Sequence, residues 1–194
     1  MAKRITPEGA SIPRERLLQT ASELFYREGI HAVGVDLIIA EADVTRATFY
    51  RHFPSKEDLV VAYLGVEDAN IRAALKQAEA ALGERPVELL GLVIEALAED
   101  VALHHTRGCP FINAAAEYPD PASRVRLTVD EHRAWFREQL RRTLEAAATT
   151  PDAAESAGEL VLLRDAAMVG GYLDGWERVR PAFIAAARRA AGIA

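Results

Sequence analysis

The sequence contains a single cysteine, Cys109, among 194 residues, so no disulfide bond can form within the chain. A lone thiol is typical of proteins from a reducing compartment. The first nine residues include two basic side chains, but no apolar run follows them, so we expect no secretory leader. No apolar stretch reaches the roughly 20 residues that a membrane span needs. We therefore expect a cytoplasmic protein that does not contact a membrane.

Aromatic residues are also scarce, at 7% of the chain. Alanine, leucine, glutamate and arginine dominate instead, and all four favour helices. The β-branched and aromatic residues that strands prefer are too few for a large sheet. Half of the residues are hydrophobic and 27% are charged, which is the composition of a globular protein with a real core. The expected fold class is all-α.

Signatures of catalysis are missing as well. The sequence has no Gly-x-Ser-x-Gly element, no phosphate-binding loop and no dinucleotide fingerprint. The neighbouring carboxylates Glu99 and Asp100 fit a solvated helix face better than an acid and base pair. We expect a protein that is not an enzyme and that needs no cofactor.

The formal net charge of −6 argues against nucleic-acid binding when it is taken as a total, but its distribution matters more. Residues 1–56 carry eight basic and seven acidic side chains, a net charge of +1. The other residues therefore hold a net charge of −7. This small basic excess at the N-terminal end gives DNA binding only weak support.

Apolar spacing, capping residues and helix breakers predict about nine helices. The expected ranges are about 13–27, 35–42, 45–52, 55–82, 86–105, 113–117, 121–147, 151–176 and 181–191. The second and third ranges are short and joined by a tight turn at Asp43, a residue type that tolerates a left-handed backbone. Thr45 is expected to cap the third helix, and Pro54 to end it. Two short helices joined in this way form a helix-turn-helix pattern.

The segment Thr45–Leu59, which reads TRATFYRHFPSKEDL, resembles the DNA-binding signature of the TetR family of repressors. The resemblance extends over about residues 14–59 and includes Leu24-Phe25, Gly29, Ile38 and Val44. It implies an all-α homodimer with an N-terminal helix-turn-helix DNA-binding domain over residues 1–56. A C-terminal helical domain over residues 57–194 would bind an effector and dimerise.

The same resemblance implies a ligand-responsive transcriptional regulator, a repressor that binds double-stranded DNA at a palindromic operator. An unidentified small-molecule effector would release it. Two symmetric groove-reading helices should meet half-sites about one DNA turn, ~34 Å, apart. Three residues depart from the family pattern. Gly34 stands where a hydroxyl residue often touches phosphate, Asp36 would repel DNA, and Asp43 replaces the commoner turn glycine.

The third predicted helix is the expected reader of the major groove. Phe49 and Phe53 are expected in the core, Arg46 could contact guanine or phosphate, and Tyr50 is expected at phosphate. Lys56 begins the next helix, where backbone N–H groups attract phosphate. The full set of expected DNA-contacting residues is Thr45, Arg46, Ala47, Thr48, Tyr50, Arg51, His52 and Lys56.

Small residues in the second-last long helix suggest a dimer interface, because they permit close helix approach. They are Ala166, Ala167, Gly170 and Gly171. The alternative is packing within the same chain.

The effector pocket is expected between the fourth and the eighth of the predicted helices. Its candidate lining residues are Tyr63, His104, His105, Cys109, Phe111, Asn113, Trp135 and Trp176. Asn113 is the best polar candidate, because it interrupts an apolar run and a buried amide needs partners. Its alternative role is to hold the Gly108-Cys109-Pro110 break in place. Residues 107–113 also resemble a segment found in one subset of these regulators.

Two other interpretations stay open. His104, His105 and Cys109 are close in sequence and could form a metal or redox sensor, although their spacing matches no known zinc pattern and we expect no metal. The second interpretation is that the chain is a degenerate family member that has lost DNA binding and acts through a protein partner. Asp36 and the small basic excess suggest it.

Overall fold

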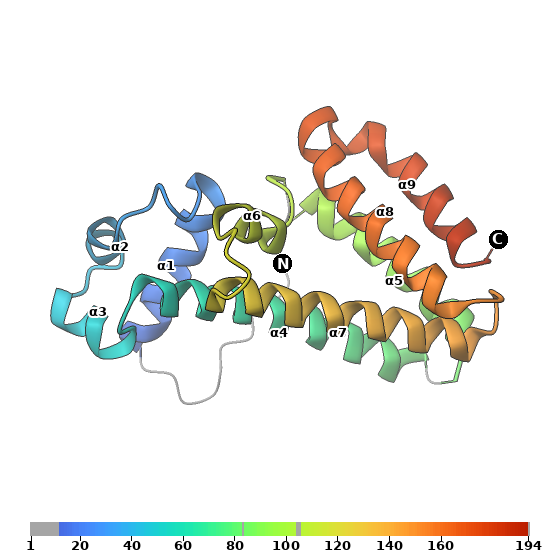
Figure 1. Cartoon of the computed structure of the whole chain (residues 1–194), viewed down its shortest axis with the longest axis horizontal. Helices are drawn as coiled ribbons and strands as arrows, with labels where there is room; N and C mark the ends of the chain where they lie inside the picture. The colour runs from blue at the N-terminus through green and yellow to red at the C-terminus, as the bar shows by residue number, and fades with distance from the viewer. Residues whose placement is uncertain (1–11, 83, 104–105, 194) are drawn as a thin grey trace. The chain divides into compact units, whose positions relative to one another are not determined.

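The chain is all-helical, as predicted. The computed structural model describes the backbone of residues 12–82, 84–103 and 106–193, and the side chains of all of these except 101–103. These residues form nine α-helices and no strand. The helices are α1 (Ile12–Glu28), α2 (Val35–Glu41), α3 (Arg46–His52), α4 (Lys56–Leu82), α5 (Pro86–Leu103), α6 (Pro110–Glu117), α7 (Arg124–Ala147), α8 (Ala153–Asp174) and α9 (Trp176–Ala190) (Figure 1). Of the helices in these ranges, none is both long and apolar enough to cross a bilayer.

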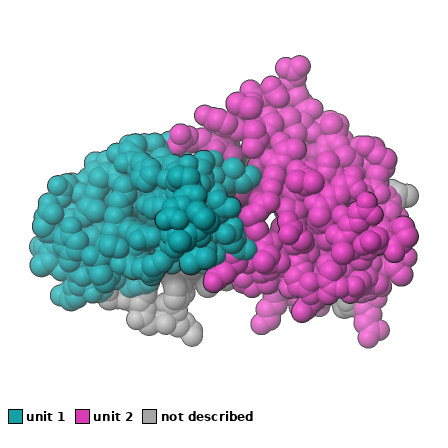
Figure 2. Space-filling view, viewed as in Figure 1, with its two compact units in different colours: residues 1–71, 110–130 teal, residues 72–109, 131–194 magenta. Residues whose placement is uncertain are grey.

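The helices group into two compact units (Figure 2). Unit 1 contains residues 1–71 and 110–130, and unit 2 contains residues 72–109 and 131–194. Each unit is therefore built from two separate stretches of sequence, with α6 in the same unit as α1, α2 and α3. The predicted functional division is a single cut after residue 56, and it stays a prediction.

Unit 1 holds the helix-turn-helix. Phe49 of α3 and Ile38 of α2 are fully buried, and Leu17 of α1 is buried with them. Asp43 has a φ of 49°, which confirms the left-handed turn between α2 and α3. The Arg16 guanidinium donates to the Ala42 and Asp43 carbonyl oxygens, so α1 fastens this turn from outside. The turn and the buried face together fix α3 on α1.

Unit 2 is built around α8 and α9, which run side by side in opposite directions and pack on α5 (Figure 1). Its core joins apolar residues of α5, α8 and α9 with those of the later part of α7. Examples are Leu90, Leu144, Leu160, Phe183 and Ala187. Gly175, with a φ of 88°, separates α8 from α9.

The starts of four helices differ from the prediction by two residues or more. α6 begins at Pro110, a residue that suits the first turn of a helix, and not near residue 113. The starts of α7 and α8 differ because the local start signals were assigned to the wrong residue. Asp120 caps only a turn through the Ala122 N–H, and Ser123 accepts from the Arg126 N–H, so α7 begins at Arg124 and not near residue 121. Asp152, rather than the Thr150-Pro151 pair, caps α8 by accepting from the N–H groups of Ala154 and Glu155.

The last helix also begins earlier than predicted. The expected start at Pro181 is wrong, because α9 begins at Trp176 and Pro181 lies inside it. Trp176 and Val179, both in this first part of the helix, pack against the core of unit 2, so tertiary contacts hold it. Packing therefore determines where α9 begins, although a proline usually marks the first turn of a helix.

The C-terminal end of α9 gives a stability prediction. Gly192 (φ +64°) follows the helix, and the N–H groups of Gly192 and Ile193 bond to the carbonyls of Arg189 and Arg188 in a Schellman arrangement. A Cβ on Gly192 would stand 2.2 Å from the Thr149 carbonyl oxygen. We expect Gly192→Ala to destabilise the chain by roughly 2–4 kcal/mol in urea unfolding, through backbone strain and overpacking.

The matched control is Gly158→Ala, inside α8, where an added Cβ meets nothing within 4 Å. It should stabilise the chain by about 0.5–1 kcal/mol, since alanine is the better helix former. Equal effects of the two substitutions would contradict the close approach at Gly192.

Candidate nucleic-acid interface

The exposed side of α3 gathers the side chains predicted to meet DNA. Arg46, Ala47 and Arg51 are exposed, and Tyr50 is 45% exposed, whereas Phe49 is fully buried. Thr45 is the N-cap residue, and its hydroxyl accepts from the Thr48 N–H at 3.1 Å, as predicted. A helix with one buried aromatic anchor and a polar opposite face has the form of a groove-reading helix.

Arg46 already has a partner on the neighbouring helix. Its guanidinium forms an ion pair with Asp36 of α2, and both side chains are mostly exposed. Asp36 therefore places negative charge at the surface of α3, and it also holds Arg46 in one orientation. An exposed pair of this kind contributes little to stability, so its main effect is on the charge and geometry of the surface.

The start of α2 confirms one departure from the family pattern. Gly34 is the N-cap residue and makes no side-chain cap. Leu37 is exposed beside the buried Ile38. The two follow each other along one short helix, so the helical turn places them on different faces. Leu37 is thus an apolar surface residue of α2 that sequence reasoning missed.

Two predicted phosphate contacts are less accessible than expected. The Lys56 side chain is half-buried, with Nζ 5.9 Å from the Phe25 ring centroid. This burial lowers the pKa of Lys56, although the Glu117 carboxylate acts in the opposite direction. His52 is also half-buried. The two exposed cations of α3 are therefore Arg46 and Arg51.

A carboxylate from a distant part of the sequence holds the connection between α1 and α2. Glu117, the last residue of α6, accepts from the N–H groups of Ile30, at 2.8 Å, and His31. Gly29, with a φ of +98°, turns the chain beside this carboxylate. No local pattern could predict the contact, because 86 and 87 residues separate the partners.

A second polar contact joins the first turns of α4 and α7. The Arg124 guanidinium pairs with Asp58, and its N–H donates to Glu57 at 3.2 Å. The Ser55 hydroxyl donates to Asp58, and with Arg124 it holds the pKa of that carboxyl below its ordinary value. Glu117 and Arg124, which both belong to the stretch 110–130, thereby join this stretch to the N-terminal helices of unit 1.

The candidate effector-pocket residues are distributed between the two units. Tyr63 and Phe111 are buried in unit 1, where Asn113 is half-buried. Cys109 is buried in unit 2, while Trp135 lies under Arg72, with 4.0 Å from its Cζ to the ring centroid, and Trp176 packs on Phe183. His104 and His105 lie outside the described residues. Of the six candidates that are described, Tyr63, Cys109 and Phe111 are buried, and the other three are half-buried.

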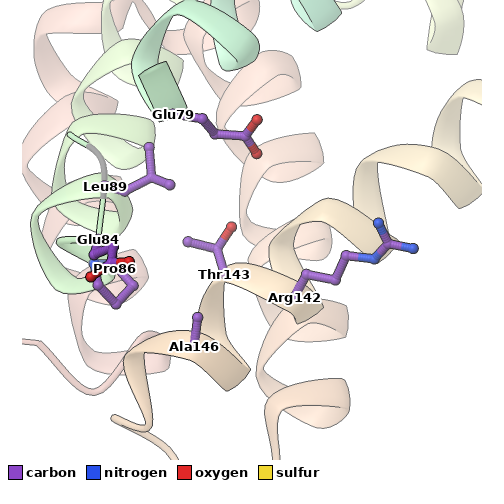
Figure 3. Close-up of a pocket in the computed structure, with 7 residues that line it drawn as sticks. All are labelled: Glu79, Glu84, Pro86, Leu89, Arg142, Thr143 and Ala146. Carbon is purple, nitrogen blue, oxygen red and sulfur yellow. The ribbon is translucent and has the colours of Figure 1, made fainter. Parts of the chain in front are cut away.

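Unit 2 also contains a surface pocket of about 410 Å³ (Figure 3). Its lining residues are Glu79, Glu84, Pro86, Leu89, Arg142, Thr143 and Ala146. None of them is a predicted pocket residue. Arg142 turns its guanidinium away from the other six in this view and donates to Glu138, and four of the seven side chains are exposed. Ligand pockets usually bury most of the surface of their ligand, whereas most of the side chains around this one are exposed.

The small residues of α8 divide into two sets. Ala166 is exposed, whereas Ala167 is buried in the core of its own chain, as the alternative of packing within the chain predicts. A Cβ on Gly170 would lie 3.3 Å from Val179, which shows that this glycine serves close packing of α8 on α9. Gly171 is half-buried.

The large apolar residues of α8 form an exposed stripe that sequence reasoning missed. Leu162 and Leu173 are 69% and 70% exposed, and Val169 is exposed between them. With Ala166 they follow a spacing of four, three and four residues, so they lie on one face of the helix. This spacing is the feature of the sequence from which the stripe could have been predicted.

A metal site is not formed by the described residues, among which no group of three or more His, Cys, Asp and Glu side chains comes together. Two of the three proposed sensor residues, His104 and His105, are not in the described part of the chain. The metal-sensor alternative therefore stays untested.

Comparison with known families accounts for most of the chain. The family described as "Bacterial regulatory proteins, tetR family" matches residues 17–63. The family described as "Tetracyclin repressor-like, C-terminal domain" matches residues 86–190. The first match contains α2 and α3 entirely, and the second runs from α5 to the last residue of α9.

Individual relatives agree with these matches. The crystal structure of a TetR-family transcriptional regulator from Streptomyces coelicolor is 40% identical, with a TM-score of 0.87 over 93% of this chain and 94% of that one. The transcriptional activator FasR of Mycolicibacterium smegmatis is 38% identical over 74 residues, 36% of this chain and 34% of the activator. The transcriptional repressor KstR of Mycobacterium tuberculosis is 33% identical over 81 residues, 42% of this chain and 36% of the repressor. The chain thus spans about a third of the length of these two curated relatives.

The Glu117 contact can be tested by amide exchange. In Glu117→Ala the N–H groups of Ile30 and His31 lose their acceptor, so their hydrogen exchange should accelerate selectively. The free energy of unfolding should fall by about 1–3 kcal/mol.

Glu28→Ala is the control, because it removes a nearby carboxylate that pairs with the adjacent Arg27. Unchanged protection of residues 30 and 31 in Glu117→Ala would show that the contact does not hold this connection.

Proposed function

Since the chain belongs to the TetR family of bacterial transcriptional regulators, and so is a transcription factor rather than an enzyme, we propose that it represses transcription as a homodimer. It would bind a palindromic operator through α3, and a small-molecule effector would release it. The observation that carries the DNA-binding part is the exposed face of α3, opposite the buried Phe49. Repression follows the KstR name, whereas FasR is named an activator, so the direction of regulation is part of the proposal.

The exposed side chains of α3 suggest distinct contacts. Arg46 is the candidate for a bidentate contact with guanine, because its planar guanidinium matches the two acceptors of that base. Tyr50 and Arg51 fit phosphate contacts, and Ala47 fits a thymine methyl group. Thr45 and Thr48 are committed to each other through their hydroxyl groups at 2.9 Å, so any DNA contact from them would accompany the cap.

Asp36 would weaken non-specific binding to DNA. In the absence of DNA its carboxylate neutralises Arg46, which lowers the attraction of this surface for any phosphate. At the correct sequence, a guanine would replace or supplement that partner. The protein-partner alternative uses the same observation, since an acidic residue at this position could also mark the loss of DNA binding.

The exposed stripe of α8 supports the dimer. Leu162, Ala166, Val169 and Leu173 would be buried against the same face of a second copy, as expected for a symmetric interface. Burial of these side chains would favour association, because full burial of an exposed leucine contributes about 1.5–3 kcal/mol. The predicted Ala166 then belongs to the interface, together with larger neighbours.

Binding to the DNA upstream of the gene that encodes this chain tests the proposal, by fluorescence anisotropy at two salt concentrations. Arg46→Ala and Tyr50→Ala should each weaken specific binding by about 1–3 kcal/mol, or roughly five- to 150-fold. Asp36→Asn should act in the opposite direction on non-specific DNA. It should raise the affinity for non-specific DNA. If Arg46 gains a phosphate contact, the slope of log K against log salt concentration should become steeper by about 0.9.

Arg178→Ala is the control, because it removes another exposed cation, one that lies on α9. Salt-insensitive or absent binding to this DNA and to genomic fragments would favour the protein-partner function instead.

The dimer is tested by light scattering of charge-inserting variants. Leu162→Glu and Leu173→Glu should convert the dimer to a monomer, because two carboxylates would be buried at the symmetric interface. Leu92→Glu, on α5, introduces the same charge at a 44% exposed leucine outside the stripe and should leave the dimer intact. A monomeric wild-type protein, or dimers of unchanged stability in both α8 variants, would contradict this interface.

A further inference from the structure

Unit 2 contains a buried cation that its own helices satisfy only in part. Arg164 of α8 is 5% exposed, and its guanidinium lies over the Phe136 ring, with Cζ 5.7 Å from the centroid. A guanidinium removed from water needs an anion and several hydrogen bonds to offset its lost hydration. The identity of its partners therefore decides what the site can bind.

The available carboxylate is shared between two arginines. Asp165 accepts from Arg133 through both oxygens, at 3.2 Å and 2.7 Å. Arg164 reaches the same carboxylate through a single bond of 3.3 Å to Oδ1. These three side chains carry two positive charges and one negative charge, and the better geometry belongs to Arg133.

The other partner of Arg164 is a weak one. Its Nη1 donates to Cys109 Sγ at 3.2 Å, and sulfur is a poor acceptor compared with a carboxylate. Both hydrogen bonds therefore leave from Nη1. Within the described residues, Nε and Nη2 make none. These two atoms form the edge of a guanidinium that binds carboxylates through two parallel N–H···O bonds.

The surroundings of Arg164 suit a small molecule with one charged end. His132 is buried and stacks on Phe136, with ring centroids 6.3 Å apart and nearly parallel planes, and the buried Cys109 accepts a hydrogen bond from Arg164. All of these residues belong to unit 2. Aromatic and thiol groups can cover an apolar remainder, while the guanidinium takes the charge.

We propose that Arg164 is the counter-ion of an anionic effector, a small organic carboxylate that binds to the Nε and Nη2 edge of its guanidinium. Cys109, a candidate pocket residue from the sequence, then contributes by orienting Arg164 rather than through redox chemistry. The regulatory consequence rests on the proposed function, but binding of the carboxylate does not.

The ion pair between Arg133 and Asp165 would set the affinity of Arg164 for the carboxylate ligand. Asp165 competes with the carboxylate ligand for Arg164, and Arg133 restrains Asp165 from doing so. Removal of Asp165 should therefore strengthen anion binding, whereas removal of Arg133 should weaken it. A purely structural role of Arg164 predicts no such opposite effects, since loss of either residue would only reduce stability.

The test uses the full chain with formate, acetate and hexanoate, against hexanamide and sodium chloride at matched ionic strength. Thermal unfolding and tryptophan fluorescence report binding, because stabilisation by a ligand grows with its concentration and both tryptophans lie in unit 2. We expect the carboxylates alone to raise the unfolding temperature. Arg164→Gln should weaken their binding at least tenfold, Asp165→Asn should strengthen it several-fold, and Arg133→Gln should weaken it.

Circular dichroism verifies that each variant is folded. If Arg164→Gln does not fold, the opposite changes in carboxylate affinity expected for Asp165→Asn and Arg133→Gln still test the anion site. Equal responses to carboxylate and chloride in both wild type and Asp165→Asn would overturn the inference, as would equal affinities in the Arg133 and Asp165 variants.

Anisotropy with DNA in the same samples separates the two proposals. Specific DNA binding without any carboxylate response refutes the anion site and leaves the proposed function intact. Carboxylate binding without DNA binding supports the site and counts against the proposed function.

Discussion

Burial of Phe49 is the constraint on which the DNA-facing surface depends. A helix of seven residues is too short to persist alone in water, so α3 exists because its apolar side is packed in unit 1. Once Phe49 points inward, the helical turn places Tyr50, the next residue, on a different face, and Arg46 is exposed at the first residue of the helix. The Thr45 cap and the left-handed turn at Asp43 fix where α3 begins. The polarity of the surface therefore follows from one hydrophobic contact.

Carboxylates do much of the remaining positioning, each in a different way. Glu117 accepts backbone N–H groups and holds the connection between α1 and α2, while Asp58 pairs with Arg124 and joins α4 to α7. Asp36 restrains a cation at the surface, and Asp165 divides its charge between two arginines in unit 2. Such charge-assisted bonds have more defined geometry than apolar contacts, which suits a protein whose function requires fixed distances between helices.

The acidic net charge of the chain is compatible with this arrangement. Acidic side chains are used in internal contacts, and the exposed cations that matter, Arg46 and Arg51, lie on one short helix. Local charge, rather than the total of −6, sets the attraction of a surface for phosphate, because salt screens the rest of the molecule beyond about 8–10 Å. A modest basic excess at the N-terminal end is then sufficient for a groove-reading helix.

The sequence by itself determined the helical class, the helix-turn-helix, the Thr45 cap, the left-handed Asp43 and the buried Phe49. All of these follow from residue type and from spacings within one or two helical turns, which act through local geometry. Only the tertiary structure decided that Glu117 meets residues 30 and 31, that Ala167 faces its own core, that α9 begins at Trp176, and that Arg164 is buried beside a shared Asp165. These features depend on which helix faces pack together, and residues far apart in sequence become neighbours through packing that no local spacing encodes.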